Sequence, residues 1–183
     1  EQAFRKVYGA NHAISFVNGT STMHAALEAI DIRPGDEVVV PPLTMASTAM
    51  VVLQANATPI FADVDSKTFQ IDPASIEEKI TSRTKAIITV ALYGGAPDLP
   101  KIRKLCDKHG LFLIEDNAEC FLGKIKNEYV GNYGEFASFS FQSSKHLTAG
   151  EGGILLVKSD KYADRVRSVQ SLGYSALSGK KSK

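Results

Sequence analysis

The stretch AIITVALYGGAPDLPKIRKLCDKHGLFLIED, residues 86–116, decides the fold class of this chain. It begins with an apolar run at 86–92 and ends with another at 111–114. Continuous apolar runs are typical of strands that are buried on both faces of a sheet. Between them, apolar residues over 99–109 recur mostly at spacings of three and four, which predicts a helix. The stretch therefore predicts two parallel strands joined by a helical crossover.

The same alternation of strands and helices extends to both sides of this unit. Pro- and Gly-containing stretches such as 33–36 and 131–134 predict the turns between the elements. Strands alternating with helices predict an α/β fold with a mainly parallel sheet flanked by helices on both faces. The further strands are expected at 13–17, 37–40, 59–62, 137–141 and 153–157, and the further helices at 22–30, 47–54, 73–80 and 161–171.

Length and charge restrict the number of domains and the kind of partner. With 183 residues, 44% of them apolar, the chain is long enough for one domain with a substantial core. Lys and Arg number 21 against 20 Asp and Glu, so no strong net charge favours nucleic acid or a membrane surface as a partner. A small-molecule partner is expected.

The cysteines and the apolar segments indicate the compartment. Cys106 and Cys120 have neither the spacing of a disulfide framework nor that of a metal site, which is typical of a reducing compartment. No run reaches the roughly 20 apolar residues of a membrane span, and no basic region precedes an apolar signal core. We expect a cytoplasmic protein that does not associate with a membrane.

Polar residues directly after strands are the candidates for ligand binding, because open α/β sheets bind ligands beyond the carboxyl ends of their strands. The segment 18–21, Asn-Gly-Thr-Ser, lies between a predicted strand and a predicted helix. Its N–H groups and hydroxyls could surround a phosphate at the helix N-terminus, or Thr20 or Ser21 could simply cap the helix. The dinucleotide-binding and P-loop glycine patterns are absent from the sequence.

Two adjacent carboxylates, Glu115 and Asp116, end another predicted strand. Neighbouring side chains of a strand point to opposite faces, so only one of them can face the site. A carboxylate there could act as a base, bind a metal or pair with a ring nitrogen, or it could cap a helix or form a salt bridge. No histidine lies at metal-ligand spacing from these acids, so no metal is expected.

Lys145 follows the aromatic strand 137–141 and precedes the glycine-rich turn 148–153. In a low-dielectric crevice its amine would become a nucleophile, although a lone lysine is usually a surface residue. An anion cradle, an amine and an acid together suit pyridoxal 5'-phosphate (PLP), which needs partners for its phosphate, its aldehyde and its pyridine nitrogen.

From about Ala13 to Gly173 the chain resembles the DegT-type family of PLP-dependent nucleotide-sugar aminotransferases, among them perosamine synthases. The resemblance implies the aspartate-aminotransferase type I fold, with residues 1–173 as an N-terminally incomplete large domain. Residues 174–183 would be a polar loop or a truncated end, and the family's small C-terminal domain has no counterpart in this sequence. The motifs that carry the resemblance are Asn18-Gly19-Thr20, Pro34-Gly35-Asp36-Glu37-Val38, Pro42-Leu43-Thr44, Asp63-Val64-Asp65, Thr84-Lys85-Ala86-Ile87, Tyr93-Gly94, Glu115-Asp116-Asn117-Ala118-Glu119, Ser138-Phe139-Ser140, and Lys145 with Gly150-Glu151-Gly152-Gly153.

The resemblance also implies roles for single residues. Lys145 would form the Schiff base with the cofactor and move the proton, and Asp116 would keep the pyridine nitrogen protonated. Met45 stands where many members have an aromatic residue over the cofactor ring, and its thioether can still pack on a ring face. Glu119 stands where many members have glutamine near the cofactor's phenolic oxygen, so it must be protonated, turned away or paired elsewhere. The phosphate would be held by Gly19, Thr20, Ser21 and Ser140.

By the same resemblance, the amino group would pass from an amino acid, in this case glutamate, to a nucleotide-linked keto-deoxy sugar. Glutamate at position 119 is shared with perosamine synthases, which favours position 4 of the sugar and a pathway to a surface polysaccharide such as the O-antigen. The protein would be a homodimer. The alternatives are other PLP chemistry, such as sugar dehydration or amination of an inositol precursor, and a non-catalytic regulator with the same fold.

Overall fold

The computed structural model describes residues 1–174 and contains one seven-stranded sheet, in the order β1-β9-β8-β5-β4-β2-β3. The pairs from β8 to β3 are parallel, while β9 runs antiparallel to both of its neighbours, β1 and β8. Apart from the exposed Tyr174, the predicted polar end lies outside the described residues. The strands of the sheet are β1 (His12–Phe16), β2 (Glu37–Val40), β3 (Thr58–Phe61), β4 (Thr84–Val90), β5 (Phe112–Asp116), β8 (Phe136–Ser140) and β9 (Gly153–Val157).

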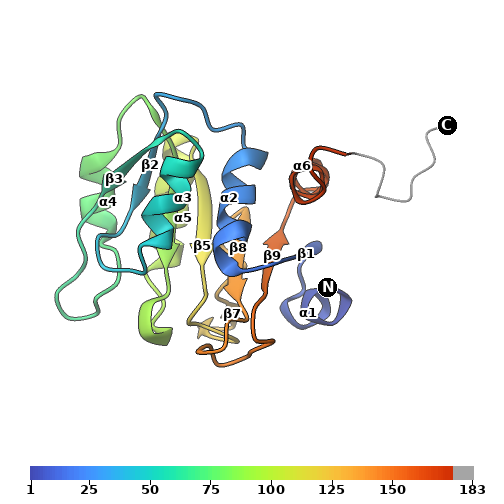
Figure 1. The fold of residues 1–183 in the computed structure, drawn as a ribbon. Coiled ribbons are helices and arrows are strands. Elements are labelled where there is room, and N and C mark those ends of the chain that lie inside the picture. Colours follow the sequence, from blue (N-terminus) through green and yellow to red (C-terminus); the bar gives the residue numbers. More distant parts are fainter. Residues whose placement is uncertain (175–183) are drawn as a thin grey trace.

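Helices cover both faces of the sheet. Figure 1 shows α2 and α3 on one face, and α1 and α6 near β1, the edge strand, and its neighbour β9. Helices α4 and α5 pack in the core of the other face. The helices are α1 (Gln2–Tyr8), α2 (Gly19–Ala29), α3 (Ser47–Gln54), α4 (Pro73–Lys79), α5 (Leu99–His109) and α6 (Asp160–Gln170), with a short 3-10 turn, η1 (Leu92–Gly94), after β4. The predicted α/β class with a mainly parallel sheet is confirmed.

Alternating side chains of the central strands pack into two separate hydrophobic cores, one on each face of the sheet. On β5, Ile114 packs with α2, α3 and α6, whereas Leu113 packs with α4 and α5. On β4, Ile88 and Ile87 divide between the same two cores. Because both faces are covered, these strands are continuously apolar, which is the pattern that identified them in the sequence.

Local sequence explains where the elements begin. Helix α2 starts at Gly19, three residues before the expected start, because Asn18 is its N-cap and accepts a hydrogen bond from the Ser21 N–H. Asp72 and Asp98 cap α4 and α5 in the same way. The small hairpin of β6 (Lys124–Ile125) and β7 (Glu128–Tyr129) was not expected.

The topology brings the carboxyl ends of β1, β2, β4, β5 and β8 to one edge of the sheet, together with the start of β9. Every segment that the sequence indicated for ligand binding lies at this edge. Within residues 1–174, no helix combines the length and the apolar character needed to cross a membrane.

Candidate functional site

A cavity of about 420 Å³ lies at the carboxyl edge of the sheet. Segments that are far apart in the sequence line it, from the start of α2 to the loop between β8 and β9. Of the predicted site residues, all but Ser21 line it. The lining residues are Asn18, Gly19, Thr20, Met23, Thr44, Met45, Ser47, Val90, Leu92, Asp116, Ala118, Glu119, Ser140, Gln142, Ser144, Lys145 and Glu151.

The N-terminus of α2 forms one wall. A Cβ on Gly19 would lie 2.9 Å from the Cβ of Ser140, so only glycine lets this helix approach β8 so closely. The first N–H groups of a helix have no partner within it. The N–H and hydroxyl of Ser21 both donate to Asn18 Oδ1, at 2.8 Å each. Gly19, Thr20 and Ser140 therefore line the cavity at this helix N-terminus, whereas Ser21 is bonded to the N-cap residue.

Asp116 ends β5 on the α2 side of the sheet and is 5% exposed. Its carboxylate accepts hydrogen bonds from the Thr48 hydroxyl and the Ala118 N–H, both at 3.2 Å. Burial raises the pKa of Asp116 to about 6, although these hydrogen bonds and the charge of Lys145 act to lower it. A buried carboxylate with remaining acceptor capacity toward a cavity is suited to a cationic N–H group of a ligand.

Glu115 points to the opposite face and takes no part in the cavity. Its oxygens accept hydrogen bonds from the backbone N–H groups of Gly131, Tyr133 and Gly134 at 2.6–2.8 Å. Burial raises the pKa of Glu115 to about 7, against the lowering effect of these three bonds. As the sequence predicted, only one of the two carboxylates faces the site.

Lys145 and Glu119 face each other in the cavity. The Lys145 Nζ lies 3.3 Å from Glu119 Oε1, and the lysine side chain is 16% exposed. The other oxygen, Oε2, accepts a hydrogen bond from the Tyr93 N–H at 2.8 Å. Tyr93 has φ +55°, a left-handed conformation that costs a non-glycine residue free energy. Of the states expected for Glu119, the structure shows pairing with other protein groups.

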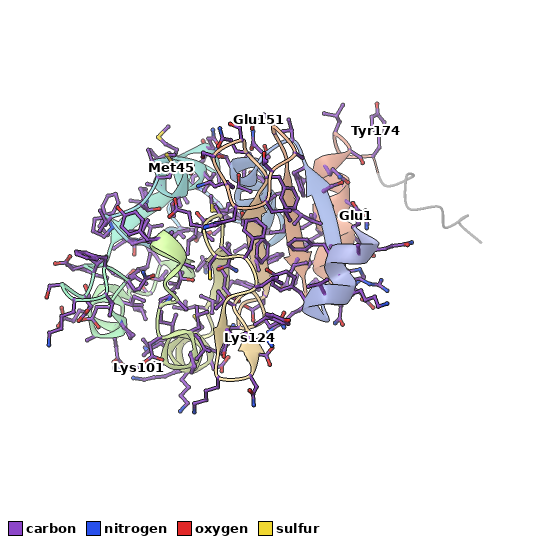
Figure 2. All side chains as sticks on the ribbon, turned by 90° about the horizontal axis from the view of Figure 1, so that it is seen from below. Glu1, Met45, Lys101, Lys124, Glu151 and Tyr174 are labelled. Atoms are coloured by element: carbon purple, nitrogen blue, oxygen red, sulfur yellow. The ribbon has the colours of Figure 1, made fainter. Side chains whose placement is uncertain are left out.

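Met45 lies at the rim of the cavity and is 69% exposed. Figure 2 shows Met45 and Glu151 on the same side of the molecule, away from Lys101 and Lys124. The Met45 side chain extends outward from the ribbon in this view. The Met45 side chain is therefore only loosely packed at the rim of the cavity.

Several lining residues were missed as single residues by the sequence reasoning. Gln142, Ser144 and Glu151 lie in the loop 141–152 between β8 and β9, which we call the lysine loop, Thr44 lies before α3, and Ser47 is the first residue of α3. The buried Thr48, which contacts Asp116, was missed as well. Thr44 and Thr48 are four residues apart, and their hydroxyl oxygens lie 2.9 Å from each other. Because Thr44 precedes the helix, the spacing of four gave no helical signal that could have identified Thr48.

The cavity fits the chemical requirements of PLP. The helix N-terminus beside Gly19 suits a phosphate, the buried Asp116 suits a protonated ring nitrogen, and the Lys145 amine can react with an aldehyde. The glycine at position 19 allows the N-terminus of α2 to lie directly against Ser140, so both border the cavity. Fold and site together define a large domain of the aspartate-aminotransferase type I class.

The chain belongs to the DegT/DnrJ/EryC1/StrS aminotransferase family, whose model matches residues 1–183. It is 39% identical over 175 residues to the spore coat polysaccharide biosynthesis protein SpsC of Bacillus subtilis, covering 96% of this chain and 45% of that protein. It is 42% identical over 173 residues to the GDP-perosamine synthase of Caulobacter vibrioides, covering 94% and 47%.

Among solved structures, the fold is similar to that of an aminotransferase from Psychrobacter cryohalolentis. The TM-score is 0.95 at 35% sequence identity, covering all of this chain and 47% of that one. The chain thus spans about half the length of the curated relatives it matches.

Proposed function

We propose that the protein containing this chain is a PLP-dependent aminotransferase that moves an amino group from glutamate to a nucleotide-linked keto-deoxy sugar. The observation that carries the proposal is the meeting of Lys145 and Asp116 in one cavity beside the N-terminus of α2. An amine for an aldehyde and a carboxylate for a ring nitrogen are the two groups that PLP chemistry requires of the protein.

In this proposal the cofactor is held by residues from four segments. Gly19 and Thr20 at the start of α2 and Ser140 at the end of β8 bind the phosphate, and Ser21 supports them by closing the helix cap. Asp116 accepts a hydrogen bond from the ring nitrogen and keeps it protonated. Met45 packs on the ring face. When bound, the cofactor supplies the electron sink for the bond changes at the substrate.

Lys145 has two roles in this proposal. Its Nζ would hold the cofactor at the aldehyde, and as a free amine Nζ would take up and return the proton that the substrate exchanges. Glu119 Oε1 lies 3.3 Å from Nζ and keeps the protonated Lys145 amine in position. The same carboxylate keeps the turn at Tyr93 closed through Oε2, so the lysine and this turn share one anchor.

The relatives support the class of substrate. One is named as a GDP-perosamine synthase and another as a spore coat polysaccharide biosynthesis protein. We propose amination at position 4 of a nucleotide-linked keto-deoxyhexose, on the way to a surface polysaccharide such as an O-antigen. Glu119, which the resemblance shares with perosamine synthases, supports this choice of position.

The rim of the cavity supports a homodimer. Val17, Met45 and Leu147 come from three separate segments, each at or within two residues of a lining residue, and are 52–69% exposed. Exposed apolar side chains gathered around a site are typical of a contact surface. We propose that a second copy of the protein covers this rim and completes the site.

A cytoplasmic location is part of the proposal. Cys106 and Cys120 are both buried free thiols. Burial raises the pKa of the Cys106 thiol to about 12, and it also raises that of Cys120. Unpaired cysteines of this kind support a reducing compartment.

The experiment is an absorption spectrum of the intact protein with added PLP, before and after borohydride, with mapping of the reduced adduct. We expect one adduct, on Lys145. Amination with glutamate is then assayed on a GDP-linked 4-keto-6-deoxyhexose, in parallel with deoxygenation and with a keto-inositol. Absence of an adduct would favour the non-catalytic regulator, and amination of the keto-inositol alone would replace the sugar with a cyclitol.

A further inference from the structure

A chain of hydrogen bonds joins two residues of the cavity wall, Thr44 and Asp116, through the buried Thr48. The Thr48 hydroxyl lies 3.2 Å from Asp116 Oδ2, and the Thr44 hydroxyl lies 2.9 Å from that of Thr48. Thr48 is fully buried in the first turn of α3, whereas Thr44 lines the cavity. We define these three side chains as the threonine relay.

The ionised form of Asp116 sets the direction of every hydrogen bond in the threonine relay. A carboxylate can only accept hydrogen bonds, so the Thr48 hydroxyl donates its one proton to Asp116. The Thr48 oxygen then has only lone pairs for Thr44, and Thr44 must donate to it. If Asp116 is protonated, it can donate instead, and both hydroxyls can turn round. The directions of the hydrogen bonds in the threonine relay therefore differ between the ionised and the protonated form of Asp116.

The hydroxyl of Thr48 also offsets part of the cost of burying the carboxylate. Burial raises the pKa of Asp116, while the Ala118 N–H, the Thr48 hydroxyl and the charge of Lys145 lower it, and the charge of Glu119 raises it again. Ala118 and Glu119 follow β5 and Lys145 lies in the loop after β8. Thr48 is thus the contribution of α3 to the charge state of Asp116.

We propose that Thr48, oriented by Thr44, is a positioning residue that holds Asp116 as the ionised acceptor required by a protonated ring nitrogen. This inference rests on the proposed function, since the ring nitrogen belongs to PLP. It extends that function because no part of the resemblance assigns a role to Thr48. Thr48 is fully buried and does not line the cavity, so it would act through Asp116.

The first test is PLP affinity, measured by absorbance titration of the intact protein. Thr48→Val keeps the shape and removes the hydroxyl, and we expect PLP binding to weaken about tenfold, which corresponds to about 1.4 kcal/mol. Thr48→Ser restores the donor and should recover most of the affinity. Thr84→Val is the matched control, because Thr84 is a buried threonine whose hydroxyl accepts from the Thr81 N–H at the other end of β4.

A double-mutant cycle separates positioning from packing. In an Asp116→Asn background, Thr48→Val should have almost no further effect on PLP affinity, because the group through which it acts has gone. An equal loss in both backgrounds would show that Thr48 only packs the helix, and PLP affinity of Thr48→Val within twofold of the wild type would also overturn the proposal.

A second measurement does not need the cofactor. Asp116 has a folded-state pKa above its unfolded value, so it lowers stability as pH rises through about 4 to 6. Removing the Thr48 donor raises that pKa further, so the fall in stability should extend to higher pH in Thr48→Val and not in Thr84→Val. Urea unfolding of the cofactor-free proteins between pH 4 and pH 8 measures this dependence of stability on pH.

The two measurements keep the proposals separate. A wild type that binds no PLP contradicts the proposed function, whereas an unchanged pH profile in Thr48→Val contradicts the role of Thr48. If Thr48→Val does not fold, Thr48→Ala and Thr44→Val take its place, with the same expected directions and a smaller effect for Thr44, which contacts Asp116 only through Thr48.

Discussion

Two adjacent carboxylates at the end of β5 lie on opposite faces of the sheet and have different surroundings. Glu115 is enclosed by the loop 131–134 and accepts three short backbone hydrogen bonds, whereas Asp116 accepts two longer ones and borders a cavity. Both are buried, and burial raises the pKa of both. Raised pKa values alone therefore do not identify the functional acid.

The difference lies in what satisfies each charge. Three backbone N–H groups of the loop 131–134 donate to the Glu115 carboxylate. This carboxylate therefore holds the loop in place, and none of its lone pairs faces the cavity. Asp116 keeps unused lone pairs toward the cavity, which is costly in the free protein and useful once a cationic partner arrives. Substitutions on the cavity side should therefore remove function, and substitutions on the loop side should remove stability.

The largest effect is expected on the cavity side, for Lys145→Ala. Turnover should fall at least about 10³-fold, because the nucleophile and the proton carrier are removed together. The borohydride adduct should disappear, while the unfolding midpoint of the cofactor-free protein stays close to that of the wild type. Full turnover in this variant would exclude Lys145 from the reaction.

On the loop side, Glu115→Ala should destabilise the protein by about 3–5 kcal/mol, because three buried N–H groups lose their acceptor. Urea unfolding measures this. The fraction that remains folded should still bind PLP with nearly unchanged affinity. Loss of affinity without loss of stability would reverse the roles assigned to the two carboxylates.

Asp116→Asn should have opposite effects on the free and the bound protein. Since a folded-state pKa of about 6 exceeds the unfolded value, the ionised carboxylate destabilises the cofactor-free protein above that pH. The amide should therefore stabilise the free protein by about 1–3 kcal/mol at pH 8, given about 1.4 kcal/mol per tenfold change in proton affinity. The added stability from PLP should be lost.

Below about pH 3 the carboxylate is mostly protonated in both the folded and the unfolded chain, and the stability gain from Asp116→Asn should vanish. Thermal unfolding at about pH 3 and at pH 8 tests the stability gain, and the same measurement with PLP at pH 8 tests the loss of stabilisation by the cofactor. A variant that is less stable than the wild type at pH 8 without PLP would show that the carboxylate is fully satisfied by the protein.

The smallest effect is expected for Glu119→Gln, which keeps an acceptor for the Tyr93 N–H and removes the charge opposite Lys145. Its side chain is 32% exposed, so we expect a stability change below about 1 kcal/mol. Glu119→Ala should cost more, because the strained turn at Tyr93 also loses its anchor. Equal losses in the two variants would assign the stabilisation to the ion pair.

Much of the fold could be predicted because the central strands are buried on both faces. The runs at 37–40 and 153–157 coincide with β2 and β9, and the helix at 99–109 with α5. The direction of β9 could not be predicted, since an apolar run is the same for a parallel and an antiparallel strand. The hairpin of β6 and β7 has two residues in each strand, too few for a period.

The site could be predicted in part because its residues follow strand ends. Asp116 and Lys145 are 29 positions apart in the sequence, and only the order of the strands places them in one cavity. Ser21 does not line the cavity, and its N–H and hydroxyl are bonded to Asn18, which caps α2 in place of the predicted Thr20 or Ser21. Thr48 was missed because its partner lies on another element, and a buried helical threonine has no distinctive pattern of its own.

The antiparallel direction of β9 has a further consequence for the amine. A parallel strand would require the chain to leave this edge by a crossover, whereas the turn from β8 into β9 keeps both ends of the lysine loop beside the cavity. The Phe141 N–H closes the base of this loop by donating to the Gly152 carbonyl at 2.8 Å. The backbone on both sides of Lys145 is therefore held at the cavity. In the proposed function this would keep the free Lys145 amine at a high effective concentration near the cofactor aldehyde.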